Sequence, residues 1–371
     1  MLNNYMAIIS LNQKENNIKS LTNSRPLATI PICGRYRIID FVLSNLVNSD
    51  VDNIGILTPL NSRSLADHLD SGKPWDLNRK TTGLSVFNFE IMSPYTSDIE
   101  ILKANFEYLY KSKEEYVILS SSNMICNIDY KMASQYFEES GADITIIYKK
   151  VNDGKKNFMD CSVLNIDKDN MVLSVGENIG TADQLNISMD MFIMKKQKLI
   201  DIEKKCVQLG FWESLREWIY RNLKENKINA YEFKGYVGYI NSISSFYKIS
   251  MDMLDPKVNR EIFFENGKIY TKVMDGPPTR HFNGCKVNNS LVANGCLIKG
   301  TVQNSIISRK VTIGKGAIVK DCIIMSNCEI KENVVLNNVI IDKNNIIDAD
   351  KELKGDKEYP LVIEKKQLVK F

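Results

Sequence analysis

Three arginines near the N-terminus are the residue type best suited to bind a phosphate group. Arg25 lies in a Ser-Arg-Pro triplet, and Arg35 and Arg37 lie in a Gly-Arg-Tyr-Arg run. A guanidinium group can form paired hydrogen bonds to phosphate oxygens. These arginines therefore predict an anion-binding site. In the structural alternative, they pair with Asp40 or cap helices.

The loop in which a phosphate site is usually expected lacks the residues for it. The first predicted strand ends at Ser10, and residues 11–20 contain neither glycine nor arginine. Ligands of doubly wound sheets bind beyond the carboxyl ends of the strands. A phosphate cradle there needs glycine, because only a backbone without Cβ can turn its N–H groups toward the oxygens closely. The first glycine is Gly34, so a cradle of the usual kind is excluded.

Cysteine and histidine are placed too sparsely for a metal centre or a disulfide framework. Eight cysteines are dispersed without a Cys-x-x-Cys pair, and the two histidines are His68 and His281. Such spacing does not match a zinc site, and we predict no metal. His281 precedes the C-terminal repeat described below, whereas a hexapeptide acyltransferase needs its histidine inside the coils.

Composition excludes several broad classes of protein. The chain has 371 residues, of which 44% are apolar and 25% charged, and its net charge is +3. These values fit a folded two-domain protein and provide no strong field for nucleic acid or an anionic membrane. No apolar run approaches the roughly 20 residues that cross a bilayer, and no leader pattern is visible. We expect a cytoplasmic protein.

The first two-thirds of the chain alternates short apolar runs with helical patterns, which predicts a doubly wound, Rossmann-like α/β domain over residues 1–254. Strands are predicted at residues 5–10, 53–58, 116–120 and 143–148, helices at 62–69, 102–110, 131–140 and 211–223, and a hairpin at 161–175.

The last third repeats itself. Aligned on itself, it gives three aliphatic columns at offsets of 15, 17 and 17 residues: Val287, Val302, Val319 and Leu336; Leu291, Ile306, Ile323 and Ile340; Ile298, Ile313, Ile330 and Ile347. Six-residue units with inward aliphatic residues predict a left-handed β-helix. We expect it to span residues 285–350, after a linker at 255–284 that contains Pro277-Pro278 and before a tail at 351–371.

The segment around the arginines resembles a known family. Gly34-Arg35-Tyr36-Arg37-Ile38-Ile39-Asp40-Phe41, with Leu43-Ser44-Asn45, is similar to the G-[KR]-[YF]-R-I-I-D-F-x-L-S-N run of the bacterial ADP-glucose pyrophosphorylases (glucose-1-phosphate adenylyltransferases). Pro74-Trp75-Asp76-Leu77, Ser188-Met189, Met251-Asp252 and the repeat match further. The resemblance implies a nucleotidyltransferase-like domain followed by a β-helix, and a family that makes ADP-glucose from ATP and glucose-1-phosphate with Mg²⁺.

This chain departs from the family wherever the reaction needs charge. The family's glycine-rich loop with its arginine corresponds to residues 11–20. Asn123 aligns with the metal-binding aspartate of the S-G-D-H motif, and Tyr239 with the second metal carboxylate, in the D-V-G-T-I motif. Asn178 replaces the lysine that holds the sugar phosphate. Loss of the metal ligands alone implies a rate loss of roughly a thousandfold or more.

The resemblance therefore implies a non-catalytic, GlgD-type regulatory subunit of the family, active in glycogen biosynthesis. Such a subunit pairs with a catalytic ADP-glucose pyrophosphorylase subunit, as a hetero-oligomer expected to be a tetramer. It needs no cofactor of its own, since Mg²⁺ serves only the catalytic partner. In the family, basic residues of the arginine region and of the β-helix border an effector site, which implies a sugar-phosphate or nucleotide effector here.

Two other functions stay open from the sequence. The chain could be an active sugar-phosphate nucleotidyltransferase whose metal ligand has moved to Asp98 or Asp129, or a stand-alone sensor of a sugar phosphate or nucleotide. Trp75 and Asp76 are candidates for a vestigial ligand pocket, with plain packing as the alternative.

Overall fold

Contacts within the protein divide the chain into two compact units. The computed structural model describes residues 2–13, 15–58, 63–79, 82–88, 97–210 and 213–365. The first unit comprises Met1–Gln13, Phe41–Val237 and Glu265–Tyr270, and the second comprises Lys14–Asp40, Gly238–Phe264 and Thr271–Phe371. Within the described ranges, no helix is long and apolar enough to cross a membrane.

The predicted division of the chain at residue 254 differs from these units. Residues 15–40 and 238–264 pack with the β-helix rather than with the N-terminal sheet. The first part of the expected linker at 255–284 is structured, because α10 (Pro256–Arg260) and a π-helical turn (Glu261–Glu265) bury Ile262 and Phe263, whereas residues 268–279 form neither helix nor strand. The sequence suggested a single boundary at residue 254, whereas each unit is built from three separate segments of the chain.

The first unit is built on a nine-stranded sheet. Its order is β10-β9-β11-β6-β1-β4-β5, and β8 pairs with both β11 and β12. The strands are β1 (Tyr5–Ser10), β4 (Asn53–Thr58), β5 (Gly83–Asn88), β6 (Tyr116–Ser121), β8 (Ile144–Val151), β9 (Ser162–Ile166), β10 (Val172–Glu177), β11 (Leu185–Lys195) and β12 (Ile228–Glu232). β6, β1, β4 and β5 are parallel, and β11 runs antiparallel to β6. The predicted strands and the 161–175 hairpin are confirmed in a mixed α/β sheet.

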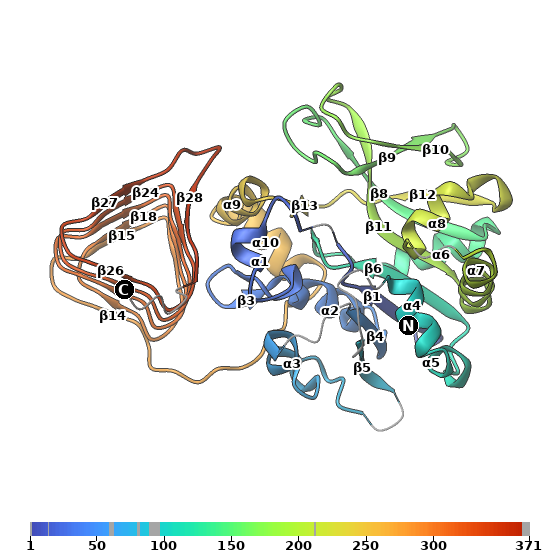
Figure 1. The fold of residues 1–371 in the computed structure, drawn as a ribbon, viewed down its shortest axis with the longest axis horizontal. Coiled ribbons are helices and arrows are strands. Elements are labelled where there is room, and N and C mark those ends of the chain that lie inside the picture. The colour runs from blue at the N-terminus through green and yellow to red at the C-terminus, as the bar shows by residue number, and fades with distance from the viewer. Residues whose placement is uncertain are drawn as a thin grey trace. The chain divides into compact units, whose positions relative to one another are not determined.

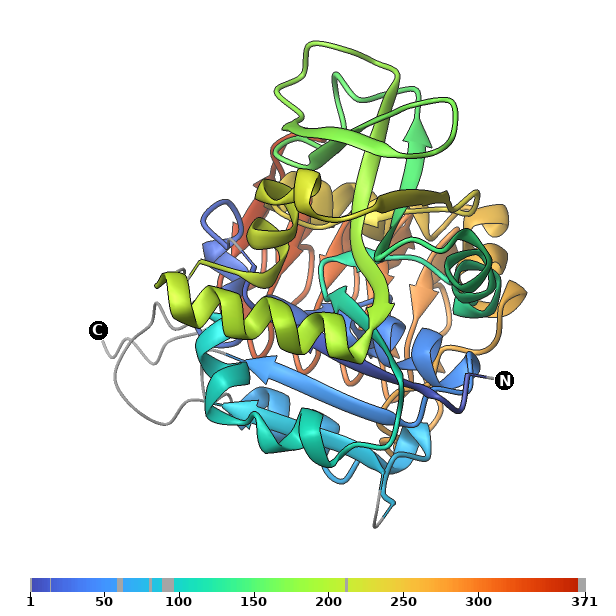
Figure 2. The same ribbon diagram turned by 90° about the vertical axis from the view of Figure 1, so that its right-hand side faces the viewer.

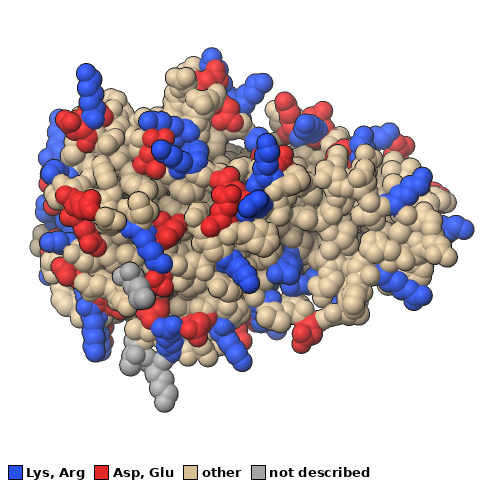
Figure 3. Space-filling view, turned by 180° about the vertical axis from the view of Figure 1, so that it is seen from behind, with Lys and Arg blue, Asp and Glu red and all other residues tan. Residues whose placement is uncertain are grey.

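Helices cover the sheet and deliver residues to its carboxyl edge. They are α2 (Ile38–Asn48), α3 (Arg63–Leu69), α4 (Asp98–Ala104), α5 (Glu107–Lys111), α6 (Tyr130–Ser140), α7 (Lys196–Leu209) and α8 (Leu215–Arg221), and α7 lies across β6 and β11 (Figure 2). The short strand β7 (Met124–Ile125) follows the turn after β6. Basic and acidic side chains are interspersed on the face seen in Figure 3.

One helix prediction is wrong and two fall partly outside the described residues. The expected helix at 102–110 is two helices, because α4 ends at Ala104, where the Asn105 side chain donates to the Ile101 carbonyl. The predicted helix starts at Ser62 and Phe211 lie outside the described residues. Gly141 ends α6 in the left-handed conformation (φ 59°).

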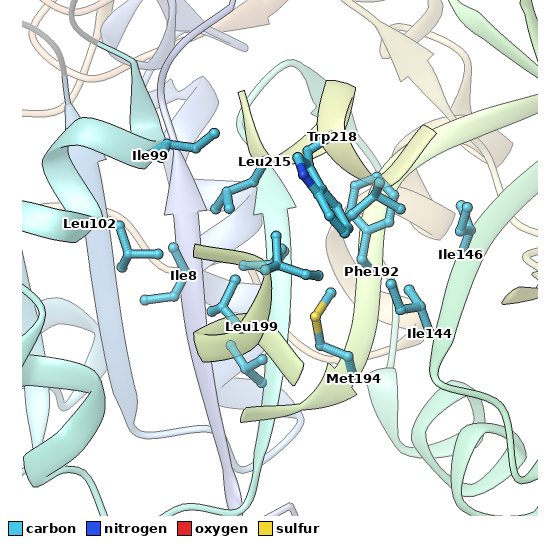
Figure 4. Packing of buried hydrophobic residues seen from close by; sticks show 14 of the residues in the cluster. Ile8, Ile99, Leu102, Ile144, Ile146, Phe192, Met194, Leu199, Leu215 and Trp218 are labelled. Atoms are coloured by element: carbon cyan, nitrogen blue, oxygen red, sulfur yellow. The ribbon is translucent and has the colours of Figure 1, made fainter. Parts of the chain in front are cut away.

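The hydrophobic core of the first unit lies between the sheet and helices α4, α7 and α8. In Figure 4, Ile8 from β1, Leu199 from α7, and Leu215 and Trp218 from α8 point toward one another. Each is almost fully buried, and such burial stabilises the fold by about 1.5–3 kcal/mol per large aliphatic side chain. This packing fixes the helix starts that surround the carboxyl ends of β1 and β6.

The second unit contains the left-handed β-helix, drawn as stacked coils in Figure 1. Its three five-stranded parallel sheets are β14-β17-β20-β23-β26, β15-β18-β21-β24-β27 and β16-β19-β22-β25-β28. Their strands are Arg280–His281, Leu297–Ile298, Thr312–Ile313, Glu329–Ile330 and Ile346–Ile347; Lys286–Asn288, Thr301–Gln303, Ile318–Lys320, Val335–Asn337 and Glu352–Lys354; Leu291–Val292, Ile306–Ile307, Ile323–Ile324, Val339–Ile341 and Leu361–Ile363. The coils extend to Ile363, so the predicted end at residue 350 is too early and part of the expected tail is the last coil.

The predicted columns have the right register, and one needs a correction. Val302 pairs with Val319, Ile306 with Ile323, and Ile313 with Ile330, as the offsets require. In the third sheet, however, the inward column is the neighbouring one: Val292, Ile307, Ile324, Ile341 and Ile363 pack with the core of the β-helix. The column of Ile306, Ile323 and Ile340 points outward and is nevertheless buried. It is buried because other residues of the second unit cover this face.

Asparagine and aspartate form the corners of the coils. Asn289, Asn304, Asp321 and Asn338 have positive φ, between 42° and 52°. These residue types tolerate the left-handed conformation better than other residues with a Cβ. The Asn289 amide donates to Asn304 at 2.7 Å, and a second corner repeats this between Asn327 and Asn344 at 3.1 Å. The ladders therefore fix the register of the coils at their turns.

The covered face of the β-helix belongs with residues 15–40 and 238–264. The first segment contains α1 (Lys19–Thr22), the 3₁₀ turn Leu27–Thr29, β2 (Pro31–Ile32) and β3 (Tyr36–Arg37); the second contains β13 (Gly238–Tyr239) and α9 (Ile243–Asp252). The Tyr247 hydroxyl on α9 donates to the Asp321 carbonyl at 2.7 Å. Gly34, with φ 78°, lies so close to the Ile307 carbonyl that a Cβ would come within 3.3 Å of it. These segments are therefore part of the β-helix unit.

Candidate functional site

A small cavity lies in the first unit at the carboxyl ends of β1 and β6, beside the middle of the antiparallel strand β11. Its volume is about 50 Å³, and it is lined by Ile8, Ser10, Asn12, Gln13, Asp98, Leu119, Ser120, Ser121, Asp190, Phe192, Ser214, Leu215 and Arg216. Its apolar floor is continuous with the core (Figure 4). Because each water needs about 10–15 Å³ of such a volume, the cavity has room for a few water molecules.

Gln13 lines the cavity at the place where the family has its phosphate loop. Its amide nitrogen donates to the Ser10 carbonyl oxygen at 2.5 Å, and its amide oxygen accepts from the Ser122 hydroxyl at 3.1 Å. Ser10 ends β1, and Ser122 follows β6. A single side chain therefore bridges the two loops between which a bound triphosphate and its metal would have to lie.

Asn123 occupies the turn after β6, where the resemblance predicts a metal carboxylate. The residue is 4% exposed, and its side-chain oxygen accepts a hydrogen bond from the Ser121 hydroxyl at 2.8 Å. Mg²⁺ in nucleotide sites is held through carboxylates and substrate phosphates. A neutral amide oxygen already engaged by serine does not fit that ion. Within the described ranges, no group of three or more His, Cys, Asp or Glu side chains could hold a metal.

A network around Asp190 fills another side of the cavity. Asp190 has φ 52° and is 5% exposed; Arg216 donates to its carboxylate at 2.9 Å, and the Tyr220 hydroxyl does so at 2.8 Å. The Tyr220 hydroxyl also lies 2.6 Å from the Ser188 hydroxyl. The Asp190 carboxylate raises the pKa of Arg216, and burial raises the pKa of Tyr220 well above its usual range. The positive charge of Arg216 is therefore compensated by the Asp190 carboxylate.

Asp98 is the buried carboxyl group at the start of α4. It accepts the Leu215 backbone N–H at 3.0 Å and is 3% exposed. Burial raises its pKa to about 6, and hydrogen bonds from Leu215, Ser10 and Ile99 offset part of that effect. The group ties α4, α8 and β1 together. This placement gives Asp98 a structural role rather than that of an exposed metal ligand.

Asn178, at the position expected for the sugar-phosphate lysine, organises a loop. Its amide nitrogen lies 2.9 Å from the Gly154 and Phe158 carbonyl oxygens and 3.1 Å from that of Asn157, and its oxygen accepts the Gly180 N–H at 3.0 Å. The residue is 3% exposed and does not line the cavity. Its polar atoms are used inside the fold, so it does not offer a cation or a free donor to a phosphate.

Three further candidates have ordinary structural surroundings. Trp75 is 2% exposed and packs edge-on against His68 with 5.9 Å between ring centroids. The Asp76 carboxylate accepts from Arg79 at 2.9 Å. Neither residue lines the cavity, and the packing alternative describes Trp75, whereas a vestigial ligand pocket at Trp75 and Asp76 stays a prediction. Asp129 caps α6 by accepting the Lys131 N–H.

Tyr239, at the position of the second metal carboxylate, is described with the second unit. It is half-buried on the short strand β13. Its phenol can donate a hydrogen bond but carries no negative charge at neutral pH. The side chain is therefore no substitute for a carboxylate ligand of Mg²⁺.

The three predicted anion-binding arginines lie in the second unit and differ from one another. Arg25 is buried, and its guanidinium donates to the Asp342 carboxylate at 2.6 Å and to the Leu21 carbonyl at 3.0 Å. Arg35 is exposed, with its guanidinium 4.9 Å from the centre of the Tyr36 ring. Arg37 is half-buried. The structural alternative of an ion pair therefore describes Arg25, although its partner is Asp342 rather than Asp40.

Two cations of the β-helix join these arginines. Burial, with Arg37 and Arg25, lowers the pKa of Lys343 to about 8, although the Asp342 carboxylate opposes them. Burial and Arg35 likewise lower the pKa of Arg309. We call Arg25, Arg35, Arg37, Arg309 and Lys343 the cation cluster. An anion beside Lys343 or Arg309 would offset the effects that lower the pKa values of these two residues.

Sequence reasoning missed five residues of these sites. Gln13, Asp190 and Arg216 had no motif that marked them, because their roles come from contacts between distant segments. Lys343 and Arg309 were hidden in the repeat. Lys343 could have been found, since it follows Asp342 directly after the inward residue Ile341, at a turn of the coil.

Models of two protein families match the chain. The nucleotidyl transferase family matches residues 17–196, and the GlmU-like C-terminal hexapeptide family matches residues 277–359. The first match covers most of the sheet of the first unit, and the second covers almost all of the β-helix. Together they agree with the observed fold.

Curated relatives extend the likeness along most of the chain. A glycogen biosynthesis protein GlgD of Bacillus subtilis is 33% identical over 86% of this chain and 84% of its own length. A GlgD of Geobacillus stearothermophilus is 32% identical over 86% and 84%. A glucose-1-phosphate adenylyltransferase of Mycoplasma mobile is 32% identical over 85% and 84%. These relatives include both GlgD proteins and adenylyltransferases.

Proposed function

The chain belongs to the glucose-1-phosphate adenylyltransferase family, and we propose that it is a catalytically degenerate, regulatory subunit in glycogen biosynthesis. In this proposal it pairs with a catalytic ADP-glucose pyrophosphorylase subunit in a hetero-oligomer, expected to be a tetramer. It changes the turnover of that subunit or its response to an effector. Mg²⁺ acts in the catalytic partner only.

The Gln13 bridge across the cavity is the observation that carries this proposal. Gln13 bridges Ser10 and Ser122, and about 50 Å³ of free volume remains where a nucleotide would have to enter. Asn123 supplies an amide where a metal carboxylate is needed. Catalysis of phosphoryl-type transfer depends on positioning and charge stabilisation. The cavity of this chain offers little positioning of a nucleotide and little stabilisation of its charge.

A regulatory role also needs a way to respond to a ligand. The cation cluster supports binding of an anionic effector, a sugar phosphate or a nucleotide. Burial and the charge of Arg37 lower the pKa of Lys343, and a bound anion would offset both effects. An effector changes a partner's activity only if it binds one conformational state better than another. We propose that the effector acts on this subunit in that way.

Pyrophosphorolysis of ADP-glucose tests the proposal. The isolated chain, the catalytic subunit and their co-expressed complex are assayed with Mg²⁺. We expect the isolated chain to be at least about a thousandfold slower than the complex. A complex in which the catalytic subunit lacks its own metal carboxylates should be equally silent, which assigns the activity to the partner.

Two results would contradict the proposal and separate its alternatives. Turnover by the isolated chain would mean a nucleotidyltransferase with a relocated metal ligand. A chain that elutes alone when it is co-expressed with the catalytic subunit, and leaves that subunit's kinetics unchanged, would instead be a stand-alone sensor.

A further inference from the structure

The first coil of the β-helix carries an imidazole and a thiol next to its core. His281, on β14, pairs in register with the inward residue Ile298 of the following coil. That column continues with Ile313, Ile330 and Ile347. Cys285 comes just before β15 and packs against the same apolar core. Because β14 is the first strand of its sheet, both residues lie at the end of the β-helix.

A tight turn brings these two side chains together. The Cys285 N–H donates to the Phe282 carbonyl at 3.1 Å, and Gly284 within the turn has φ 84°. Glycine suits this position because a residue with a Cβ is strained at positive φ. The Cys285 sulfur lies 3.9 Å from His281 Nδ1, which is within hydrogen-bond reach for sulfur. The pair therefore joins a nucleophile to a base that can accept its proton.

Cys285 is also more accessible than the other cysteines. All eight cysteines lie in the described ranges; seven are buried, and Cys285 is half-buried. His281 is exposed, and a Cβ added at Gly284 would meet no atom within 4 Å. Buried cysteines are inert, whereas reactive ones are partially exposed. A dissolved molecule can therefore approach the Cys285 sulfur over the turn.

The surroundings of the pair are basic. Residues 276–320 contain seven lysines and arginines and neither aspartate nor glutamate. The Arg280 guanidinium carbon lies 4.6 Å from the centre of the Phe282 ring, and Lys299 Nζ lies 5.3 Å from the same centre. Phe282 thus holds two cations beside the turn that ends at Cys285. Positive charge at this place raises the local concentration of anionic molecules.

We propose that Cys285 and His281 form a thiol-modification site for low-molecular-weight disulfides that carry carboxylates. His281 Nδ1 accepts the thiol proton, and the Cys285 sulfur attacks one sulfur of the disulfide. The S–S bond of the small molecule breaks as the new S–S bond to Cys285 forms, and the leaving thiolate takes the proton from His281. The products are a mixed disulfide and a free thiol, so no further oxidant is needed. This site does not depend on the proposed regulatory role.

Reaction of the folded full chain with glutathione disulfide tests the site. This probe is chosen because its carboxylates outnumber its amino groups. Mass spectrometry of peptides follows the adduct at each cysteine over time at neutral pH. We expect Cys285 to be modified first, at least about tenfold faster than each buried cysteine, because a buried thiol reacts only after the fold opens locally. Dithiothreitol should remove the adduct.

Matched variants separate the base from the charge. His281→Gln should slow the modification of Cys285 at least about tenfold, because it removes the base. Lys320→Gln, at an exposed position on β21, is the control and should leave the rate unchanged. Arg280→Gln combined with Lys299→Gln should slow the reaction with glutathione disulfide but not the reaction with cystamine, a cationic disulfide. Urea denaturation verifies that each variant is folded.

Three results would overturn the proposal. If a buried cysteine reacted first, or if the folded chain formed no adduct, Cys285 would not be a modification site. Equal rates for His281→Gln and the natural protein would remove the imidazole from the reaction. If the charge variant lost the same fraction of its rate with cystamine as with glutathione disulfide, the assignment to anionic disulfides would be wrong.

Discussion

The cavity of the first unit and the cation cluster of the second unit treat their polar groups in opposite ways. In the cavity, Arg216 faces Asp190, and Gln13 is bonded to Ser10 and Ser122. In the cluster, Lys343 faces arginines, and its pKa is lowered to about 8. A site whose groups satisfy one another needs no ligand, whereas one that holds like charges together is stabilised by an anion. The comparison separates a lost catalytic site from a proposed regulatory one.

The largest expected effect concerns the frame that holds the cation cluster. Ile330→Asp places a charge in the inward column of the β-helix, where Ile330 is fully buried, and should lower the free energy of unfolding by about 4 kcal/mol or more. Urea denaturation measures it. Ile346→Asp, at an exposed position in the same sheet, is the matched control and should cost under about 1 kcal/mol. Equal losses for both variants would refute the register.

The next effect tests how residues 15–40 are attached to the β-helix. Arg25→Met leaves the Asp342 carboxylate buried without its cation, which should cost about 3–5 kcal/mol of unfolding free energy. Adding Asp342→Leu should recover most of that loss. Arg79→Met, which removes exposed ion pairs with Asp52 and Asp76, should cost no more than about 1 kcal/mol. If Arg25→Met cost no more unfolding free energy than Arg79→Met, the ion pair of Arg25 with Asp342 would not hold residues 15–40 on the β-helix.

A smaller effect concerns the cavity and depends on pH. Burial raises the pKa of Asp98 from 3.8 to about 6, so folding favours the protonated acid. The stability that this contributes is complete below about pH 4 and is lost as the pH rises to about 6. Asp98→Asn should remove this dependence and be more stable than the natural protein at pH 7.5, by up to about 3 kcal/mol. Thermal unfolding from pH 4 to 8 measures the difference, and parallel profiles would contradict the burial argument.

The smallest effect concerns the corners of the coils. Asn327 has φ 62° and donates to Asn344. Asn327→Ala should cost about 1 kcal/mol, because alanine is strained in the left-handed conformation, while Asn327→Gly should cost less. Denaturant titration of the two variants checks this order. An alanine variant more stable than the glycine variant would mean that the corner conformation is not what selects asparagine.

Local patterns were sufficient to predict some of the elements of the fold. Alternating apolar runs gave β1, β4, β6 and β8, and the 15- and 17-residue offsets gave the coil register. The inward face of the third sheet was misassigned because both Ile323 and Ile324 are buried, one by the coil and one by other residues of its unit. Sequence hydrophobicity does not distinguish these two ways of burying a side chain.

The candidate sites were less accessible from sequence. The absence of charge at Asn123 and Asn178 was readable from the aligned motifs, but the new bonds of these residues were not. Gln13, Asp190 and Lys343 acquire their roles from partners more than 20 residues away in the chain. One sequence without an alignment contains no signal for such pairs, because each residue looks like an ordinary surface polar group.

Binding of ATP with Mg²⁺ to the isolated chain tests the central claim most directly. Isothermal titration calorimetry of this chain, with the catalytic subunit as the positive control, measures it. The Gln13 bridge across the cavity and the amide at Asn123 predict that no saturable heat of binding is measured at nucleotide concentrations up to the millimolar range. A single-site isotherm that is saturable, requires Mg²⁺ and is lost in a bulkier Ser122→Phe variant would place a nucleotide in the cavity and contradict the account.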